Sequence, residues 1–118
     1  MLNRFFILFL FFINISNGFA QDPFYQILDK KDGLPSNTVY DIIQDRKGFI
    51  WVAHDEGLSR FDGFHFKNYE SITQTSKAGS CIIEDSLGRI WYSNFDGYIY
   101  YIENDSMKEL KMGTPLGY

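Results

Sequence analysis

Short apolar runs, each bounded by turn residues, follow one another along most of the chain. In the stretch 45–63 an Asp-x-x-Gly turn leads into a Trp-centred apolar run, and a second glycine and an Asp-Gly pair follow at once. This spacing leaves no room for a helix, and short apolar runs between turn signals are typical of β-strands. The pattern therefore predicts an all-β protein.

The same pattern returns about forty residues later, in the stretch 85–104. The register also extends upstream, where Ile42-Ile43 aligns with Ile82-Ile83. The aligned pairs that we expect to be structurally equivalent are Asp45 and Asp85, Gly48 and Gly88, Trp51 and Trp91, and Gly57 and Gly97. An internal repeat with a period near 40 residues is typical of only a few architectures.

Each repeat predicts four short strands. The expected strands are Val39–Gln44, Phe49–Ala53, Leu58–Phe61 and Phe64–Asn68 in the first copy, and Ser80–Glu84, Arg89–Ser93, Tyr98–Ile102 and Met107–Leu110 in the second. Runs such as Ile50–Ala53 are apolar on both faces, so layers should pack on each side of the sheet. Four antiparallel strands per repeat, stacked between copies of themselves, are the composition of a β-propeller blade.

The turn residues explain the connections within a blade. Asp45 can accept a hydrogen bond from the backbone two residues on, and Gly48 can take the positive-φ corner. The register extends both expectations to Asp85 and Gly88. It also predicts that Trp51 and Trp91 are equivalent, buried blade residues.

The repeat divides the chain into five segments: a signal peptide (1–20), a closing strand with the loop that leads into the first blade (21–38), the first blade (39–78), the second blade (79–112) and the start of a third blade (113–118). Phe24–Leu28 aligns with the fourth strand of a blade, so we expect it to close the last blade of a ring. A ring needs roughly 4–8 blades. These residues alone should therefore form two adjacent sheets with the N-terminal strand unpaired.

The first twenty residues have the layout of a secretory signal. One cation, Arg4, precedes an unbroken apolar run at Phe5–Ile13, and small residues follow. Cleavage is expected between Ala20 and Gln21. The nine apolar residues are far fewer than the roughly 20 that a membrane-spanning helix needs, which favours a signal peptide over an anchor.

Charge and cysteine content narrow the functions further. The whole chain has 11 Lys and Arg against 15 Asp and Glu. Because Arg4 lies in the signal, the mature chain has a net charge of −5. The acidic residues are scattered among turns, so no nucleic-acid partner is expected.

Cys81 is the only cysteine and lies in an apolar run, where we expect a buried free thiol.

A family resemblance strengthens the prediction of a propeller. The motifs Gly33-Leu34-Pro35-Ser36-Asn37, Asp45-x-x-Gly48-x-Ile50-Trp51 and Gly57-Leu58-Ser59-Arg60-Phe61-Asp62-Gly63 closely resemble the two-component regulator propeller repeat. That repeat occurs in the exported sensor regions of bacterial histidine kinases, especially of Bacteroidetes-type bacteria. The resemblance covers about residues 24–102. The second copy departs from it, because Glu103-Asn104 replaces the Asp-Gly pair.

The resemblance implies a function and a location. It implies a periplasmic, ligand-binding sensor region whose full-length protein is anchored in the inner membrane and ends in a cytoplasmic histidine kinase. The implied partners are an extracellular small molecule or oligosaccharide, the remaining blades of the same chain, and a second copy in a homodimer. An exported adhesion or protein-interaction propeller is the alternative, and a propeller-borne hydrolase or lyase is a third reading.

Blade geometry places the candidate binding residues. In a four-stranded meander, the loop before the first strand and the turn between the second and third strands share one rim. Propellers usually take ligands on that rim. The candidates there are Asn37, His54, Asp55, Glu56, Asn94 and Asp96. Loop polarity alone would give the same residues.

Catalytic chemistry finds little support in the sequence. No nucleophile motif, phosphate-binding loop or metal-ligand cluster is present, so no catalytic residue, metal or cofactor is assigned. His54 and His65 lie eleven positions apart on different predicted elements, and we expect both to be ordinary surface or loop histidines. These 118 residues are therefore not expected to be an enzyme by themselves.

Overall fold

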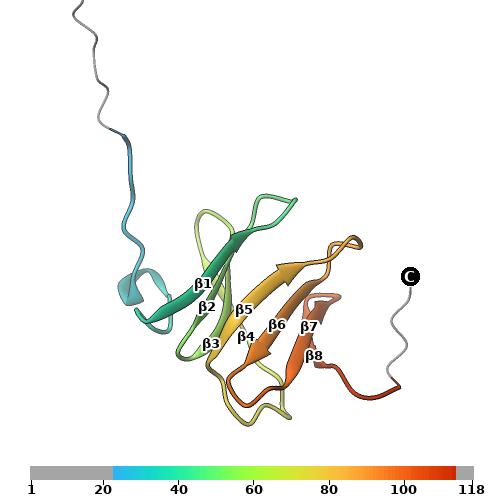
Figure 1. Cartoon of the computed structure of the whole chain (residues 1–118). Helices are drawn as coiled ribbons and strands as arrows, with labels where there is room; N and C mark the ends of the chain where they lie inside the picture. Colours follow the sequence, from blue (N-terminus) through green and yellow to red (C-terminus); the bar gives the residue numbers. More distant parts are fainter. Residues whose placement is uncertain (1–22, 114–118) are drawn as a thin grey trace, which may run out of the picture.

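The computed structural model describes residues 23–113, which fold into two four-stranded antiparallel sheets placed side by side (Figure 1). The strands of the first sheet are β1 (Val39–Gln44), β2 (Ile50–His54), β3 (Gly57–Phe61) and β4 (Phe66–Tyr69). Those of the second are β5 (Gly79–Glu84), β6 (Ile90–Asn94), β7 (Ile99–Glu103) and β8 (Ser106–Glu109). Each sheet is an up-and-down meander in chain order, so each is a propeller blade.

All eight strands of the repeat were predicted, with bounds that differ by at most two residues. The largest difference lies at β4, which begins at Phe66 and not at Phe64. The carboxylate of Asp62 accepts hydrogen bonds from the backbone N–H groups of Phe64 and His65, at 2.8 and 2.7 Å. These bonds hold both residues in the turn, which delays the start of the strand.

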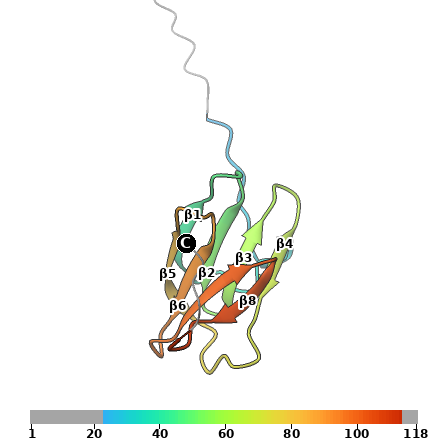
Figure 2. The same cartoon turned by 90° about the vertical axis from the view of Figure 1, so that its right-hand side faces the viewer.

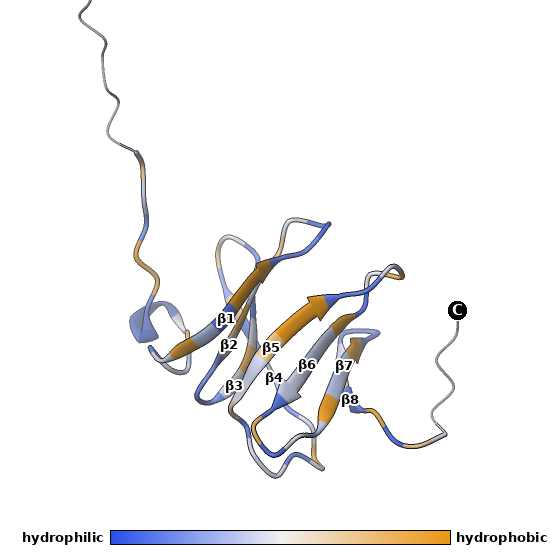
Figure 3. Ribbon diagram, viewed as in Figure 1, coloured by the Kyte–Doolittle hydropathy of each residue, from blue (hydrophilic) through white to orange (hydrophobic). Residues whose placement is uncertain are grey.

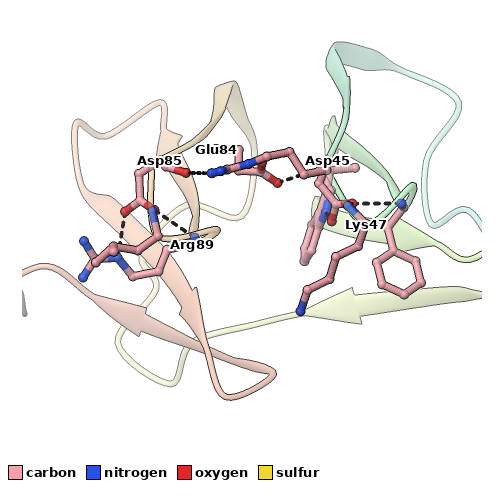
Figure 4. Close-up of polar contacts among 9 residues, drawn as sticks. Asp45, Lys47, Glu84, Asp85 and Arg89 are labelled. Atoms are coloured by element: carbon pink, nitrogen blue, oxygen red, sulfur yellow. Dashed lines mark hydrogen bonds and ion pairs between the residues drawn. The ribbon is translucent and has the colours of Figure 1, made fainter. Parts of the chain in front are cut away.

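The Asp-x-x-Gly turns of the two blades have the same internal structure (Figure 4). Asp45 Oδ1 accepts the N–H groups of Lys47 and Phe49, and Oδ2 accepts Trp51 Nε1–H at 2.8 Å. Asp85 binds the backbone at 87 and 89 and Trp91 Nε1–H in the same way. Gly48 and Gly88 have φ of +92° and +79°, as the register predicts. One carboxylate thus ties each turn to the strand that follows it.

The two blades pack face to face, with β5 lying against β1 and β2 (Figures 1 and 2). Their shared core consists of Trp51, Ala53, Leu58 and Tyr69 from the first blade and Ile82, Ile90, Tyr92, Tyr100 and Met107 from the second. Trp51 stacks on Tyr69 at 5.2 Å between ring centroids. This packing uses one face of each sheet.

Among the described residues, no further sheet packs on the opposite faces of the two sheets, although Leu28 and Leu34 lie against part of the outer face of the first blade, where Val52 is buried. Figure 3 shows the apolar stretches of β1 and β5, and the exposed members Ile42 and Ile83 belong to these opposite faces. The expectation of two equally buried tryptophans is therefore wrong, because Trp51 faces the second blade while Trp91 is only half-buried. The expected burial of Cys81 is wrong for the same reason, since its thiol lies on the open face of β5.

The N-terminal segment before the first blade forms no strand. Phe24 is 97% exposed, and residues 23–27 run away from the sheets in Figure 1. Its role as a closing strand stays a prediction. A single 3₁₀ turn, η1 (Lys30–Asp32), follows, with Asp29 and Asp32 capping it reciprocally. The expected signal peptide and its cleavage site between Ala20 and Gln21 lie outside the described residues.

Candidate functional site

The β2–β3 and β6–β7 turns lie on the rim that the sequence pointed to. The backbone N–H of Asp55 donates to the Thr38 carbonyl at 3.1 Å. At the equivalent position of the second blade, Phe95 N–H donates to the Ala78 carbonyl at 3.0 Å. Each turn is thus fixed to the chain that enters its own blade, which makes this rim a rigid part of the fold.

His54 is not the surface histidine that the sequence suggested. It is 1% exposed, because the tight turn from Asp55 to Gly57 makes it the last paired residue of β2. Its ring lies between two partners: Glu56 N–H donates to Nδ1 at 3.1 Å, and Nε2 lies 2.7 Å from Ser59 Oγ. Since Nδ1 accepts, Nε2 carries the proton and donates to Ser59.

The hydrogen-bond chain continues from Ser59 and ends at an amide. Ser59 Oγ donates to Asn68 Oδ1 at 2.5 Å, and Ser59 is completely buried. Burial also lowers the pKa of His54, although Glu56 and Asp55 oppose the shift. The imidazole is therefore neutral, and both of its nitrogens are used in hydrogen bonds within the first blade. A histidine and a serine within bonding distance here do not form a nucleophilic pair, because no substrate can reach either of them.

Asn94, the equivalent of His54 in the second blade, also has a buried structural position. It is 5% exposed. Its Nδ2 donates to the Ser76 carbonyl at 3.0 Å, and its Oδ1 accepts from Tyr98 N–H at 2.9 Å. The side chain thereby fastens the linker between the blades to the β6–β7 turn. The expectation that His54 and Asn94 face solvent at the rim is wrong, and their part in ligand binding stays a prediction.

The exposed candidates gather around two aromatic side chains that the sequence analysis did not select. Tyr40 OH donates to Asp55 Oδ1 at 3.2 Å, and the Tyr40 ring meets the Phe95 ring edge to face at 5.0 Å. The hydrogen bond to Asp55, burial and the Asp55 charge raise the pKa of Tyr40. We call Tyr40, Asp55, Phe95 and Asp96 the rim patch.

The rim patch spans both blades and is open to solvent. Tyr40 and Asp55 come from the first blade, and Phe95 and Asp96 come from the second. Asp96 Oδ2 accepts from Thr75 Oγ1 at 2.8 Å, which links the patch to the interblade linker. Exposed Phe95 in a polar turn is the sequence signal that could have identified the aromatic part. Tyr40 gave no such signal, because it lies inside a predicted strand.

The other two rim candidates lie beside this patch rather than within it. Glu56 is exposed and uses its backbone N–H to hold His54. Asn37 Oδ1 accepts from Lys30 N–H at 3.0 Å, so this side chain fixes the η1 turn. Exposed aromatic rings beside carboxylates can bind a ligand that offers both an apolar face and hydroxyl donors.

The described residues hold neither a metal-binding cluster of side chains nor a membrane-spanning helix. Among residues 23–113, no group of three or more His, Cys, Asp and Glu side chains is placed to hold a metal ion. In the same range, no helix is long and apolar enough to cross a membrane.

Polar contacts on the opposite rim lock the blades together. The Arg46 guanidinium pairs with Glu84 and bonds the Asp85 carbonyl, and Figure 4 shows Glu84 between the Asp45 and Asp85 turns. Farther out, Asp105 receives hydrogen bonds from three residues of the first blade: Arg60, Lys67 and Tyr69. Those bonds lower the pKa of Asp105, with Lys67 as the largest cause.

The two adjacent four-stranded meanders are propeller blades, and comparison with known proteins agrees. Residues 33–56 match the family described as two component regulator propeller. The matched stretch comprises the loop before the first blade, β1, β2 and the beginning of the β2–β3 turn. It is also similar to histidine kinase P4 of Formosa agariphila, with 44% identity over 45 residues. That match covers 38% of this chain and 3% of the relative, so the chain corresponds to a small part of that protein's length.

Proposed function

We propose that these residues belong to the extracytoplasmic, ligand-sensing propeller of a two-component histidine kinase, and that the rim patch is its ligand-contacting surface. The rim patch is the observation that carries the proposal. Tyr40 and Asp55 on one blade and Phe95 on the next meet there, so a ligand that binds the patch contacts both blades at once. The repeat match and the kinase relative supply the signalling context.

The ligand class follows from the side chains of the patch. Aromatic edges pack on apolar ring faces, and carboxylates accept hydrogen bonds from hydroxyl groups. An oligosaccharide or another polyhydroxylated small molecule offers both. Because the patch lies across the two blades, its occupancy would favour one relative orientation of the blades, and a kinase farther along the chain would respond to that orientation.

The binding claim is tested on the full-length protein that carries this chain. Its exported region is applied to an array of neutral and acidic oligosaccharides, together with Tyr40→Ala, Phe95→Ala and a His65→Gln control whose exposed side chain lies in the β3–β4 turn, on the opposite rim. We expect at least one oligosaccharide to bind, at least about tenfold more weakly in either aromatic variant and unchanged in the control. Binding that neither aromatic variant weakens would refute the rim patch as the site.

The location is tested separately. Alkaline phosphatase fused after Tyr118 is active only once it is exported, so the fusion should be active in living cells. Deleting residues 1–20 should abolish that activity. An active enzyme after the deletion, or an inactive one before it, would contradict export through the signal peptide and leave the oligosaccharide result untouched.

A further inference from the structure

A groove between the blades opens on the rim opposite the rim patch. Its volume is about 550 Å³. The β1–β2, β5–β6 and β7–β8 turns form its walls, and the rings of Phe49 and Trp51 contribute to its apolar lining. Both walls belong to described residues, so the groove does not depend on any further blade. Its volume lies within the range of small-molecule sites.

The carboxylates that line this groove already accept hydrogen bonds from other groups of the protein. Asp45 accepts two backbone N–H groups and the Trp51 indole. Glu84 uses both oxygens on Arg46. Asp105 uses both oxygens on Arg60, Lys67 and Tyr69. The negative groups are therefore already matched by donors, and they offer little to an incoming cation.

Two cations of the groove keep spare donors. Lys47 makes only a backbone hydrogen bond, to Asp45, and Figure 4 shows its side chain extending into the space between the two sheets. The Arg60 guanidinium has a long contact with Asp105, 3.3 Å from Nη1 to Oδ1, and its buried Nε has no acceptor. An arginine carries five N–H donors, so guanidinium donors other than the buried Nε remain for a ligand, and Lys47 lines the same groove.

The apolar side chains of the groove favour a ligand whose uncharged part is apolar. The Arg60 guanidinium carbon lies 4.6 Å from the centre of the Phe49 ring and 5.8 Å from that of Trp51. The Arg60 guanidinium thus lies close to these aromatic rings, with its side chain 24% exposed. A ligand that brings an anionic group to Lys47 and Arg60 would place the rest of its body against the same apolar surface.

From these contacts we propose that the interblade groove binds a small organic carboxylate that carries a ring. Lys47 and Arg60 receive the carboxylate, and the half-buried Phe49 and the exposed Leu87, which line the same groove, pack against the ring. The site is separate from the rim patch, and it does not rest on the function proposed for that patch.

Saturation-transfer NMR on the full-length protein tests the proposal with benzoate as the probe. The expected result is saturable binding of benzoate that Lys47→Gln weakens about threefold to tenfold. Lys47→Arg should restore the affinity, and Lys31→Gln should leave it unchanged. Because the Lys47 hydrogen bond to Asp45 comes from the backbone N–H and survives the substitution, the variant should fold normally, which far-UV circular dichroism checks.

Two comparison ligands make each part of the proposal refutable. Benzamide has the ring without the charge, and inorganic sulfate has charge without the ring. Neither should compete with benzoate at matched concentration. Equal competition by benzamide would overturn the role of the cations, equal competition by sulfate would overturn the role of the ring, and benzoate binding that Lys47→Gln leaves unchanged would overturn the site.

Discussion

Ile42 and Ile82 hold the same position in consecutive repeats, yet Ile42 is 61% exposed and Ile82 is 3% exposed. The difference comes from packing and not from the strands, because both residues pair with the second strand of their own blade in the same register. Ile82 faces the first blade. Ile42 faces outward, on a sheet surface against which no other described sheet packs. Each blade thus has one sheet face that packs against the other blade and one apolar face on which no other blade packs.

The difference between the two sheet faces can be measured from the solvent exposure of the two tryptophans. Trp51 is buried between the blades, while Trp91 is half-buried on the outer face. In the isolated chain, acrylamide should quench the fluorescence of a Trp51→Phe variant, which retains Trp91, more strongly than that of Trp91→Phe. In full-length protein, each retained indole should be shielded to a similar degree. Trp51→Ala should destabilise the fold by about 3–5 kcal/mol. Equal quenching in the isolated chain would show that the faces do not differ.

One hydrogen bond between the blades can be tested by comparing substitutions at equivalent positions of the two blades. Asp41 Oδ2 accepts from the backbone N–H of Ile82 at 2.9 Å, and the equivalent residue in the second blade is Cys81, whose thiol is exposed. Asp41→Ala should lower the local free energy of opening at the Ile82 amide by about 1–2 kcal/mol. Cys81→Ala should change it by less than about 0.5 kcal/mol. Hydrogen exchange on the full-length protein measures both, and equal effects would remove Asp41 from the blade contact.

Gly79 is a position where a side chain does not fit. A Cβ there would overlap the Ser93 carbonyl oxygen and the Tyr92 ring, whereas nothing lies within 4 Å of a Cβ at Gly48. Gly79→Ala should destabilise the second blade by about 2 kcal/mol or more, since the obstacle includes backbone. Gly48→Ala should cost about 1 kcal/mol, from its positive φ alone. Local hydrogen exchange separates the two, and an alanine at 79 that is tolerated better than one at 48 would contradict the packing.

The sequence predicted what depends on local spacing, and it missed what depends on side-chain contacts between strands or between blades. The strands, the Asp45 turn and its repeat at Asp85 follow from local spacing and turn chemistry. The contact between Asp41 and Ile82 joins residues forty positions apart, and its geometry exists only once the sheets have packed. Gly79 gave no sequence signal either, because the Tyr92 ring that fills its space comes from the neighbouring strand.

The candidate site shows the same division. Sequence reasoning predicted which turns share this rim, and Asp55 and Asp96 are exposed there. It placed His54 in solvent, because it put the end of the second strand one residue too early. The pairing of His54 with Gly57 instead draws the imidazole into the sheet. Tyr40 entered the rim patch only through its contact with Phe95 of the other blade.

Acid should weaken the first blade through His54. Burial lowers the pKa of His54 in the folded protein, whereas an unfolded histidine has a pKa of about 6.5. As the pH falls through about 6.5, the unfolded chain takes up the proton first, so stability decreases below that pH and is regained above it. His54→Gln should flatten this dependence between about pH 7.5 and pH 5.5.

The matched control for the pH experiment is His65→Gln, which removes the exposed histidine of the β3–β4 turn and leaves the buried hydrogen-bond chain intact. Hydrogen exchange of the β2 and β3 amides, followed against pH in the full-length protein, gives the measurement. A wild-type profile in His54→Gln would mean that the buried imidazole does not titrate with unfolding.

The central claim is that each blade has a sheet face built to be covered by another blade. Thermal unfolding of purified Gln21–Tyr118, followed by circular dichroism with light scattering at several concentrations, tests it most directly. The uncovered apolar faces and open strand edges predict a broad, low-temperature transition accompanied by self-association. A cooperative transition of a monomer at ordinary mesophilic temperatures would show instead that the two sheets form a complete small domain.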